Sequence, residues 1–466
     1  MMIQTDTIIA LATPSGAGAI AIIRLSGQNA ITIASKHFES VSGKTLENQK
    51  SHTIHLGYIK DGENVLDQAL VSIFKNPHSY TGENVIEISC HGSPYIQQQI
   101  IQLFLRNGCR TADAGEFTLR AFLNGKMDLS QAEAVADLIS SDNAASHQIA
   151  VQQMRGGFSN EIKQLRTELL NFASLIELEL DFSEEDVEFA DRTQFKELLT
   201  RIQKVLQSLI DSFSVGNVIK NGIPVAIVGE PNVGKSTLLN AFLNEERALV
   251  SDIAGTTRDT IEDEISIGGI GFRFIDTAGI RETEDVVEGM GIKRTFEKIE
   301  QAQVVLLLVD GSKLLSDDKK LQNIVIDFEK IKNQNPLKPL VLLVNKADTL
   351  SEDDKNKIGT YLDNVKYLSA KTGEGVEALQ NNLLEFVNTG ALRNNETIVT
   401  NTRHYDSLLK ALEEIEKVQF GMKAELSSDL MAIDVKEALY HLGEITGQVT
   451  NDELLGNIFA NFCIGK

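Results

Sequence analysis

One stretch constrains the fold of this chain more than any other: Gly229-Glu230-Pro231-Asn232-Val233-Gly234-Lys235-Ser236 fits the pattern GxxxxGK[ST]. It follows the apolar run IPVAIVG and precedes STLLNAFLN, whose apolar residues recur at helical spacing. A strand, a glycine-rich turn and a helix in this order curl backbone N–H groups around a phosphate, while the lysine reaches its outer oxygens and the serine ligates Mg²⁺. The stretch predicts a doubly wound α/β nucleotide-binding domain whose phosphate-binding residues are Gly229, Asn232, Val233, Gly234, Lys235, Ser236 and Thr237.

Three further motifs predict which nucleotide binds. Each follows an apolar, strand-like run: Asp276-Thr277-Ala278-Gly279 follows FRFI, Asn345-Lys346-Ala347-Asp348 follows VLLV, and Ser369-Ala370-Lys371 follows VKYL. Parallel strands present their carboxyl ends at one sheet edge, so we expect these motifs to meet there, with Asp276 near a magnesium ion. Asp348 can accept hydrogen bonds from N1–H and the 2-amino group of guanine, whereas adenine offers neither donor. The sequence therefore predicts a GTP-binding domain.

Changes in periodicity divide the chain into four segments. Residues 1–121 alternate short β-rich runs with glycine-bearing turns, which predicts a small α+β domain. Residues 122–217 and 385–466 have helical periodicity, and the first of these helices is expected over 119–141. Residues 218–384 alternate strands and helices. We therefore expect a multidomain α+β and α/β protein, in which the doubly wound GTPase domain is inserted into one helical-bundle domain.

Composition and charge exclude several classes of protein. The chain has 466 residues and a formal net charge of −22, which argues against a broad surface for nucleic acid, because clustered Lys and Arg bind the phosphate backbone. No apolar run approaches the roughly 20 residues of a membrane span, and Asp6 lies where a signal peptide carries positive charge, so we expect a cytoplasmic protein. The acidic block 177–191 is more typical of a solvated loop than of a metal site.

The group that activates water is left open by the local sequence. In Ras-like GTPases the residue after this type of DTAG motif is a glutamine that orients the attacking water. Here it is Ile280, which can neither orient nor deprotonate water. Several carboxylates between residues 281 and 292 are alternatives, and the sequence does not choose among them.

Two cations are candidates for stabilising the transition state. One is Arg258, acting as an arginine finger from the same chain. The other is a monovalent ion, held by the Asn232 side chain and by backbone carbonyls of the run from Ser251 to Asp259. That run contains Thr256, and its neighbour Thr257 would complete the magnesium shell.

Motifs outside the GTPase domain resemble one family. The stretches TPSGAGAIAIIRLSG, SYTGENVIEISCHG, GEFTLRAFLNGKMDLSQAEAVADLI, AGTTRD, DTAGIRE and the final CIGK are similar to signatures of the TrmE (MnmE) family of tRNA modification GTPases, among the TrmE-Era-like GTPases, over essentially the full length. The resemblance implies a potassium-activated GTPase whose GTPase domains pair across a homodimer. It implies that Glu288 orients the water, that Ser236 and Thr257 ligate Mg²⁺, and that K⁺ is held by Asn232, Ser251, Ile253 and Thr256.

The same resemblance implies a second cofactor and a partner. The N-terminal domain of this family binds a one-carbon folate, 5-formyl- or methylene-tetrahydrofolate, and the matching positions are Arg24, Glu87, Lys126 and Lys466. The implied reaction installs an aminomethyl-type or carboxymethylaminomethyl group at C5 of the wobble uridine, U34, of certain tRNAs. It is implied to proceed in a heterotetramer-type complex with a flavoprotein, MnmG (GidA).

Two questions stay open at this point. A regulatory switch that acts on ribosome assembly or signalling, or a passive GTP-binding scaffold, would also suit an inserted GTPase domain. The tail NFCIGK is either a frayed end or, if the helical run NDELLGNIFANF fixes it, part of the tRNA-modifying site. In the second case Cys463 is a candidate participant in the tRNA chemistry, and Lys466 a candidate folate ligand.

Overall fold

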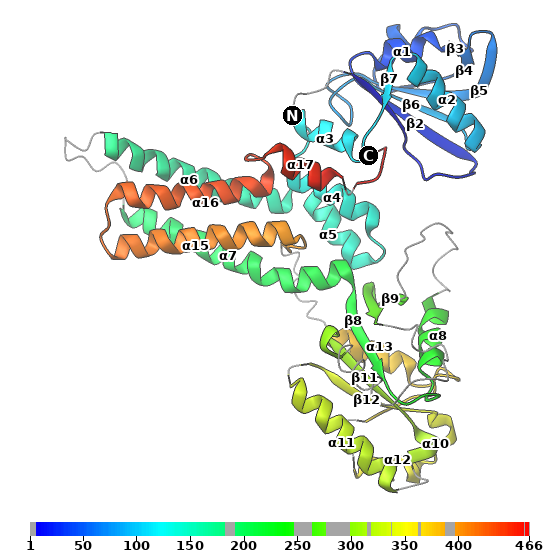
Figure 1. Ribbon diagram of the computed structural model, residues 1–466, viewed down its shortest axis with the longest axis vertical. Coiled ribbons are helices and arrows are strands. Elements are labelled where there is room, and N and C mark those ends of the chain that lie inside the picture. The colour runs from blue at the N-terminus through cyan, green and yellow to red at the C-terminus, as the bar shows by residue number, and fades with distance from the viewer. Residues whose placement is uncertain are drawn as a thin grey trace. The chain divides into compact units, whose positions relative to one another are not determined.

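A computed structural model describes residues 6–181, 192–246, 263–275, 299–314, 318–336, 338–361, 365–386, 397–460 and 462–465. The chain divides into two compact units (Figure 1). The first comprises Met1–Ser140, Ala150–Leu206 and Asp406–Lys466, and the second comprises Ser141–Ile149 and Gln207–Tyr405. The predicted fold class, a multidomain mixture of α+β and α/β parts with a helical bundle, is confirmed. The four domain ranges expected from the sequence stay a prediction.

The N-terminal part of the first unit is built on a sheet in the order β3-β4-β5-β6-β2-β1-β7. Neighbouring strands are antiparallel except for the parallel pair β1 and β7. The strands span Thr7–Leu11 (β1), Ile20–Ser26 (β2), Phe38–Ser40 (β3), Thr53–Asp61 (β4), Asn64–Phe74 (β5), Val85–His91 (β6) and Cys109–Thr111 (β7).

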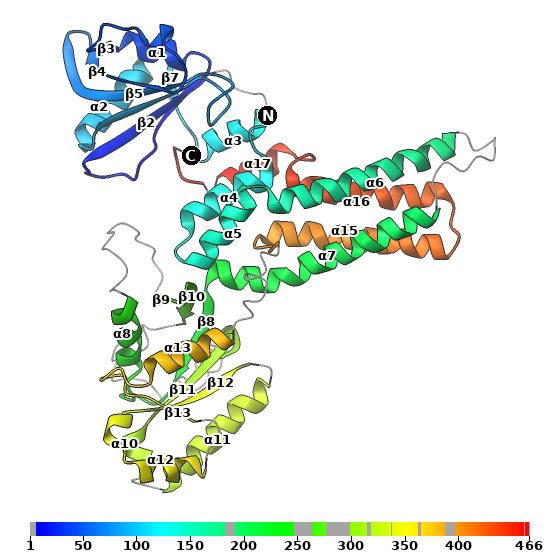
Figure 2. The same cartoon turned by 180° about the vertical axis from the view of Figure 1, so that it is seen from behind.

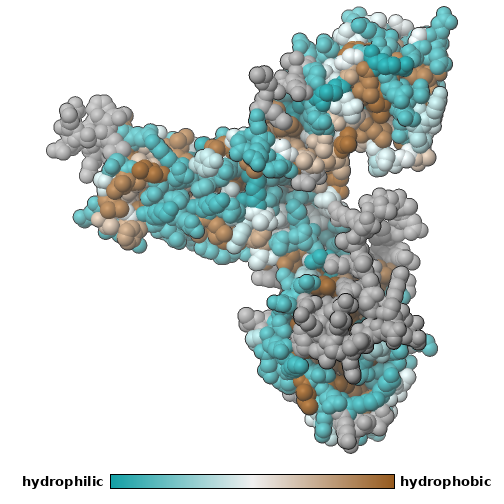
Figure 3. Space-filling model, in the orientation of Figure 1, coloured by the Kyte–Doolittle hydropathy of each residue, from teal (hydrophilic) through white to brown (hydrophobic). Residues whose placement is uncertain are grey.

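The two faces of this sheet differ in burial. Helices α1 (Ala30–Lys36) and α2 (Pro94–Arg106) lie against the sheet (Figure 2). Their apolar side chains form a core with the buried side chains of one sheet face, which alternate with outward-facing residues along the strands. A short 3₁₀ helix, η1, spans Leu46–Asn48. The opposite face carries exposed apolar side chains, among them Ile20, Ile54 and Leu56, and hydrophobic surface is visible on this domain in Figure 3. An apolar sheet face left open in this way is typical of an interaction surface.

The helical part of the first unit contains long helices that pack side by side. Phe172 of α6 stacks on Phe195 of α7, and Gln203 of α7 hydrogen-bonds to Glu416 of α15. The helices span Glu116–Leu123 (α3), Leu129–Ser140 (α4), Ala144–Met154 (α5), Gly157–Asp181 (α6), Arg192–Asn221 (α7), Thr402–Lys423 (α15), Ser428–Thr446 (α16) and Asp452–Phe459 (α17). Parts of three of them, residues 144–149, 207–221 and 402–405, are assigned to the second unit. Within the described residues, no helix is long and apolar enough to cross a membrane.

The helix expected over 119–141 is interrupted, so that prediction was wrong. The loop between α3 and α4 contains Gly125 at φ +66°, a conformation that favours glycine. Asp128 then begins a new helix, because its carboxylate accepts hydrogen bonds from the Gln131 N–H and the Ser130 hydroxyl. Helical periodicity continues through both helices and conceals the break between them.

The second unit is a doubly wound domain with strand order β13-β12-β11-β8-β10-β9. Apolar side chains on both faces of the sheet are buried, as a parallel sheet covered by helices requires. The strands span Ile223–Val228 (β8), Asp263–Ile267 (β9), Ile270–Phe274 (β10), Val304–Asp310 (β11), Leu340–Asn345 (β12) and Lys366–Tyr367 (β13). The helices are Lys235–Glu246 (α8), Gly311–Leu314 (α10), Asp318–Gln334 (α11), Ala347–Thr349 (η4), Glu352–Gly359 (α12) and Val376–Glu385 (α13).

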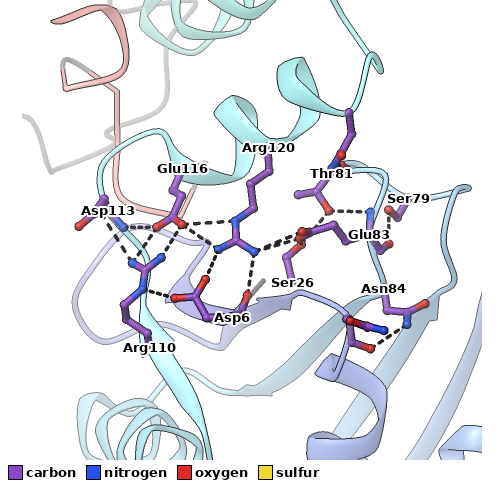
Figure 4. A network of polar contacts seen from close by, with 12 residues as sticks. Asp6, Ser26, Ser79, Thr81, Glu83, Asn84, Arg110, Asp113, Glu116 and Arg120 are labelled. Atoms are coloured by element: carbon purple, nitrogen blue, oxygen red, sulfur yellow. Dashed lines mark hydrogen bonds and ion pairs between the residues drawn. The ribbon is translucent and has the colours of Figure 1, made fainter. Parts of the chain in front are cut away.

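A network of charged side chains fastens α3 to the N-terminal sheet domain (Figure 4). The Arg120 guanidinium, whose side chain is 6% exposed, lies 2.9 Å from Asp6 Oδ1, 2.9 Å from Glu116 Oε1 and 3.2 Å from Glu83 Oε2. Arg110 bonds the first two of these carboxylates as well, at 2.6 and 2.7 Å. Its hydrogen bond holds the pKa of Asp6 below the ordinary value. Burial opposes the ionisation of Glu116, but hydrogen bonds from both arginines outweigh it and lower its pKa.

Replacing Arg120 by methionine should destabilise the N-terminal domain by about 3 kcal/mol, because the largely buried Glu83 loses its arginine, while Asp6 and Glu116 keep Arg110. Hydrogen exchange of the β1 and β2 amides measures the local free energy of opening. Arg106→Met is the matched control, since Arg106 forms an exposed ion pair with Asp61. The control should lose at most about 1 kcal/mol. Equal protection in the two variants would contradict a structural role for the network.

Candidate functional sites

The predicted phosphate-binding loop lies between β8 and α8, at the carboxyl end of the sheet. Gly234 has φ +102°, and a side chain there would overlap the Asn345 amide. Asn232 also has a left-handed backbone, with φ +63°. Lys235 Nζ donates to the Gly229 carbonyl at 2.6 Å, across the loop. Ser236 and Thr237 are exposed in the first turn of α8, where their hydroxyls and N–H groups are open to a ligand.

Asn345 joins three of the predicted motifs. Its Nδ2 donates to the Val233 carbonyl of the phosphate loop at 2.7 Å, and its Oδ1 accepts from the Ala370 N–H at 2.9 Å. The side chain is buried, so these bonds are shielded from water. One amide therefore fixes the phosphate loop, the NKAD motif and the SAK motif against one another at the carboxyl ends of β8, β12 and β13.

The side chains expected to contact the base lie around this amide. Asp348 is exposed within η4, where its carboxylate is open to a ligand. Lys346 has φ +63° and places its ammonium 2.7 Å from Asp310 Oδ2. Ser369 and Ala370 are buried, and Lys371 is exposed beside them. The arrangement has the exposed carboxylate, the anchored loop and the helix N-terminus that binding a guanine nucleotide requires.

Several predicted residues lie outside the described ranges. Strand β10 ends at Phe274, just before the DTAG motif. The roles of the following residues therefore stay predictions: Ser251, Ile253, Thr256, Thr257, Asp276, Thr277, Ala278, Gly279, Glu288 and Lys466.

A second polar site lies on the open face of the N-terminal sheet. Arg24 of β2 and Glu87 of β6 are directly paired across the strands, and their side chains are 2.8 Å apart. The rings of Tyr80 and Phe117 lie 5.4 and 5.6 Å from the Arg24 guanidinium, within the range of cation–π contacts. Lys126 belongs to the same neighbourhood, because its Nζ donates at 3.0 Å to the Pro77 carbonyl, three residues before Tyr80. The structure thus pairs two of the described folate candidates, Arg24 and Glu87, and places the third, Lys126, against the Pro77 carbonyl.

The C-terminal tail is attached to this site. Ile464 pairs with Ala114 in an antiparallel bridge, and the Gly115 N–H donates to the Cys463 carbonyl at 3.4 Å. The Arg24 guanidinium donates to the Gly465 carbonyl at 3.3 Å. Cys463 is exposed, whereas Cys90 and Cys109 are buried. The tail therefore has a defined place beside the Arg24–Glu87 pair and is not frayed over its described residues.

Comparison with known proteins gives matches over the whole chain. The family described as MnmE helical domain matches residues 129–463, and the family described as GTP-binding protein TrmE N-terminus matches residues 7–126. A tRNA modification GTPase MnmE of Flavobacterium psychrophilum is 75% identical over 465 residues, covering 100% of both chains. A protein of the same name from Flavobacterium johnsoniae is 73% identical over 469 residues, again covering 100% of both. The chain belongs to the MnmE family.

The family resemblance expected from the sequence is thereby confirmed. Among solved structures, a probable GTP-binding protein engB matches 35% of this chain and 98% of its own at 21% identity and a TM-score of 0.27, which is too weak to add to the MnmE assignment.

Sequence reasoning missed three side chains that lie at or beside these two candidate sites. Asp310 ends the apolar strand VVLLLVD at the ligand edge, which is a signal of the same kind as the NKAD motif. Tyr80 and Phe117 carry no such signal, because isolated aromatic residues usually belong to a core.

Proposed function

We propose that this protein hydrolyses GTP as part of the modification of tRNA. The observation that carries the proposal is the convergence of the phosphate loop, the NKAD motif and the SAK motif on one buried amide, Asn345. The relatives that match the full chain are named tRNA modification GTPases, which supports the same activity. In this proposal Asp348 recognises guanine and the phosphate loop holds the phosphates.

The residues present fit the metal ions that the proposal requires. The Ser236 hydroxyl is exposed at the start of α8 and would hold Mg²⁺ together with Thr257 and Asp276. Asn232 is exposed in the phosphate loop, and its amide oxygen would hold K⁺ with Ser251, Ile253 and Thr256. When bound, both ions neutralise charge that develops on the phosphates. Glu288 is proposed to orient the attacking water, because Ile280 follows the DTAG motif where Ras-like GTPases have glutamine.

The second site fits a reduced folate. A carboxylate such as Glu87 can accept from pterin N–H donors, and Arg24, Lys126 and Lys466 can bind the carboxylates of the folate glutamate. Tyr80 is partly exposed, so its ring can stack on a flat heterocycle beside Arg24, whereas Phe117 is fully buried in the core. When bound, the folate supplies a one-carbon unit. The exposed tail at Cys463 lies beside this site, so Cys463 is proposed as a participant in the tRNA chemistry.

The open sheet face supports a homodimer. Strand register places Ile20, Leu70, Leu56 and Ile54 on the same face as Arg24 and Glu87, and each of these four apolar side chains is at least 45% exposed. A second copy of the chain would bury this surface and bring two folate sites close to the interface.

The flavoprotein MnmG is proposed as the further partner, and C5 of the wobble uridine U34 as the position modified. A partner with a basic surface would compensate for the net charge of −22 at the tRNA.

Two measurements test the proposed function. GTP turnover should be much faster in potassium than in sodium chloride, and Glu288→Ala should bind GTP but lose hydrolysis by at least about 100-fold, as removal of a water-positioning group predicts. Equal rates in both salts would eliminate the potassium site, and unchanged turnover by Glu288→Ala would eliminate the assignment of Glu288.

Nucleoside mass spectrometry of tRNA from a deletion strain should show unmodified wobble uridine. Normal tRNA with defective ribosomes would instead favour a regulatory switch.

A further inference from the structure

The geometry points to Asp310 as a positioning residue for guanine recognition, which acts by holding Lys346 in place. This inference rests on the proposed role of the NKAD motif in binding guanine. Asp310 is the last residue of β11 and pairs in register with Asn345, the last residue of β12. The two side chains therefore leave the sheet next to each other at the edge where the phosphate loop lies.

The two oxygens of the Asp310 carboxylate have different partners. Oδ1 accepts from the Ser312 N–H at 3.1 Å and from the Ser312 hydroxyl at 2.6 Å, which caps the short helix α10. Oδ2 accepts from Lys346 Nζ at 2.7 Å. Burial opposes the ionisation of Asp310, but the bonds from Lys346 and Ser312 outweigh it and lower its pKa. Oδ1 thus stabilises the start of α10, and Oδ2 holds the Lys346 ammonium.

The Lys346 side chain is held at one end and open along its length. Its side chain is 40% exposed, whereas that of Asp310 is 3% exposed. Lys346 has a left-handed backbone, with φ +63°, and lies in the sequence between the buried Asn345 and the exposed Asp348. A lysine stem has many rotamers in solution, so anchoring its ammonium before the nucleotide arrives lowers the entropy lost on binding. In the proposed complex, the methylene groups of the anchored lysine can pack against the purine ring.

The substitution Asp310→Asn separates the two roles. The asparagine oxygen still caps α10, but its NH₂ group cannot accept a hydrogen bond from the Lys346 ammonium. We expect the dissociation constant of fluorescently labelled GDP and the KM for GTP to rise about 10-fold, because one charge-assisted hydrogen bond organises the site. The kcat at saturating GTP and the melting temperature of the nucleotide-free protein should stay the same, since the phosphate loop and the fold are intact.

A double-mutant cycle identifies the partner of Asp310. Lys346→Met keeps an apolar stem and removes the ammonium, so adding Asp310→Asn to Lys346→Met should weaken GDP binding no further. Lys313→Gln is the matched control, because Lys313 lies 3.9 Å from the same Oδ2 atom. It should leave GDP affinity unchanged. The inference is overturned if Asp310→Asn binds GDP with normal affinity, or if the affinity losses of Asp310→Asn and Lys346→Met add fully in the double variant. It is also overturned if the kcat and the melting temperature of Asp310→Asn fall together with its affinity for GDP.

The failure of this inference is distinguishable from failure of the guanine site itself. Asp348→Asn, tested in parallel, reports whether the NKAD motif reads the base. A shift of base preference in Asp348→Asn with normal affinity in Asp310→Asn would overturn only the role of Asp310. No shift in Asp348→Asn would overturn the proposed site, and with it the basis of the inference.

Discussion

Asp348→Asn should change the base preference of the GTPase domain from guanine to xanthine. The carboxylate is exposed in η4, beside the loop that Asn345 anchors, and accepts from both N1–H and the 2-amino group of guanine in the proposed complex. An asparagine amide can accept from N1–H but opposes the 2-amino group with its own NH₂. Xanthine has a carbonyl oxygen at that position, which accepts from the new NH₂ group.

The expected size of this change is large. Loss of one charge-assisted hydrogen bond and the opposition of two donors should lower kcat/KM for GTP by at least about 100-fold, and kcat/KM for XTP should rise above that for GTP. Steady-state hydrolysis of GTP and of XTP by both proteins measures this change of preference. Asp353→Asn is a suitable control, because Asp353 is exposed in the first turn of α12 and belongs to none of the predicted motifs. An Asp348→Asn protein that still prefers GTP would exclude Asp348 as the reader of the base.

Gly465→Ala should abolish most tRNA modification while leaving GTP hydrolysis intact. Gly465 has φ +99°, and a Cβ atom at this position would overlap the Leu11 carbonyl. Both the strained backbone and the overlap oppose the attached position of the tail. The tail would then leave the Arg24–Glu87 pair, and Cys463 would leave with it. The GTPase residues belong to the second unit and keep their own contacts.

The measurement is nucleoside mass spectrometry of tRNA from a strain whose only copy carries the variant. Strain and overlap together cost a few kcal/mol, so modified wobble uridine should fall at least about 10-fold. Gly456→Ala is the control, since Gly456 lies within α17 and an added methyl group would meet no neighbour within 4 Å. Cys463→Ser, tested in the same strain, removes the thiol without changing Gly465. It therefore distinguishes a need for the thiol from a need for the attached tail. Full modification by Gly465→Ala would show that the attached tail is not needed.

The sequence predicted that the phosphate loop, the NKAD motif and the SAK motif meet at one sheet edge, because each motif is local, and the roles of their residues stay predictions. The phosphate loop needs a strand, two glycines and a helix within a short stretch, and each base-reading motif closes an apolar strand whose carboxyl end lies at the ligand edge. Apolar strands and helical periodicity likewise predicted the fold class. The break at Gly125 was not predicted, since α3 and α4 both continue the helical pattern on either side of it.

Only the tertiary structure decided which distant residues meet. The sequence determined that Lys346 and Arg24 are cations near their motifs. It did not show that Lys346 pairs with Asp310, or that Arg24 lies over the rings of Tyr80 and Phe117 and contacts the tail at Gly465. Periodicity and motif spacing are set by neighbouring residues along one strand or helix. Asp310 and Lys346 are 36 positions apart in the sequence, and Arg24 and Gly465 are 441 positions apart. Contacts over such distances depend on how whole strands and helices pack, so no local sequence pattern predicts them.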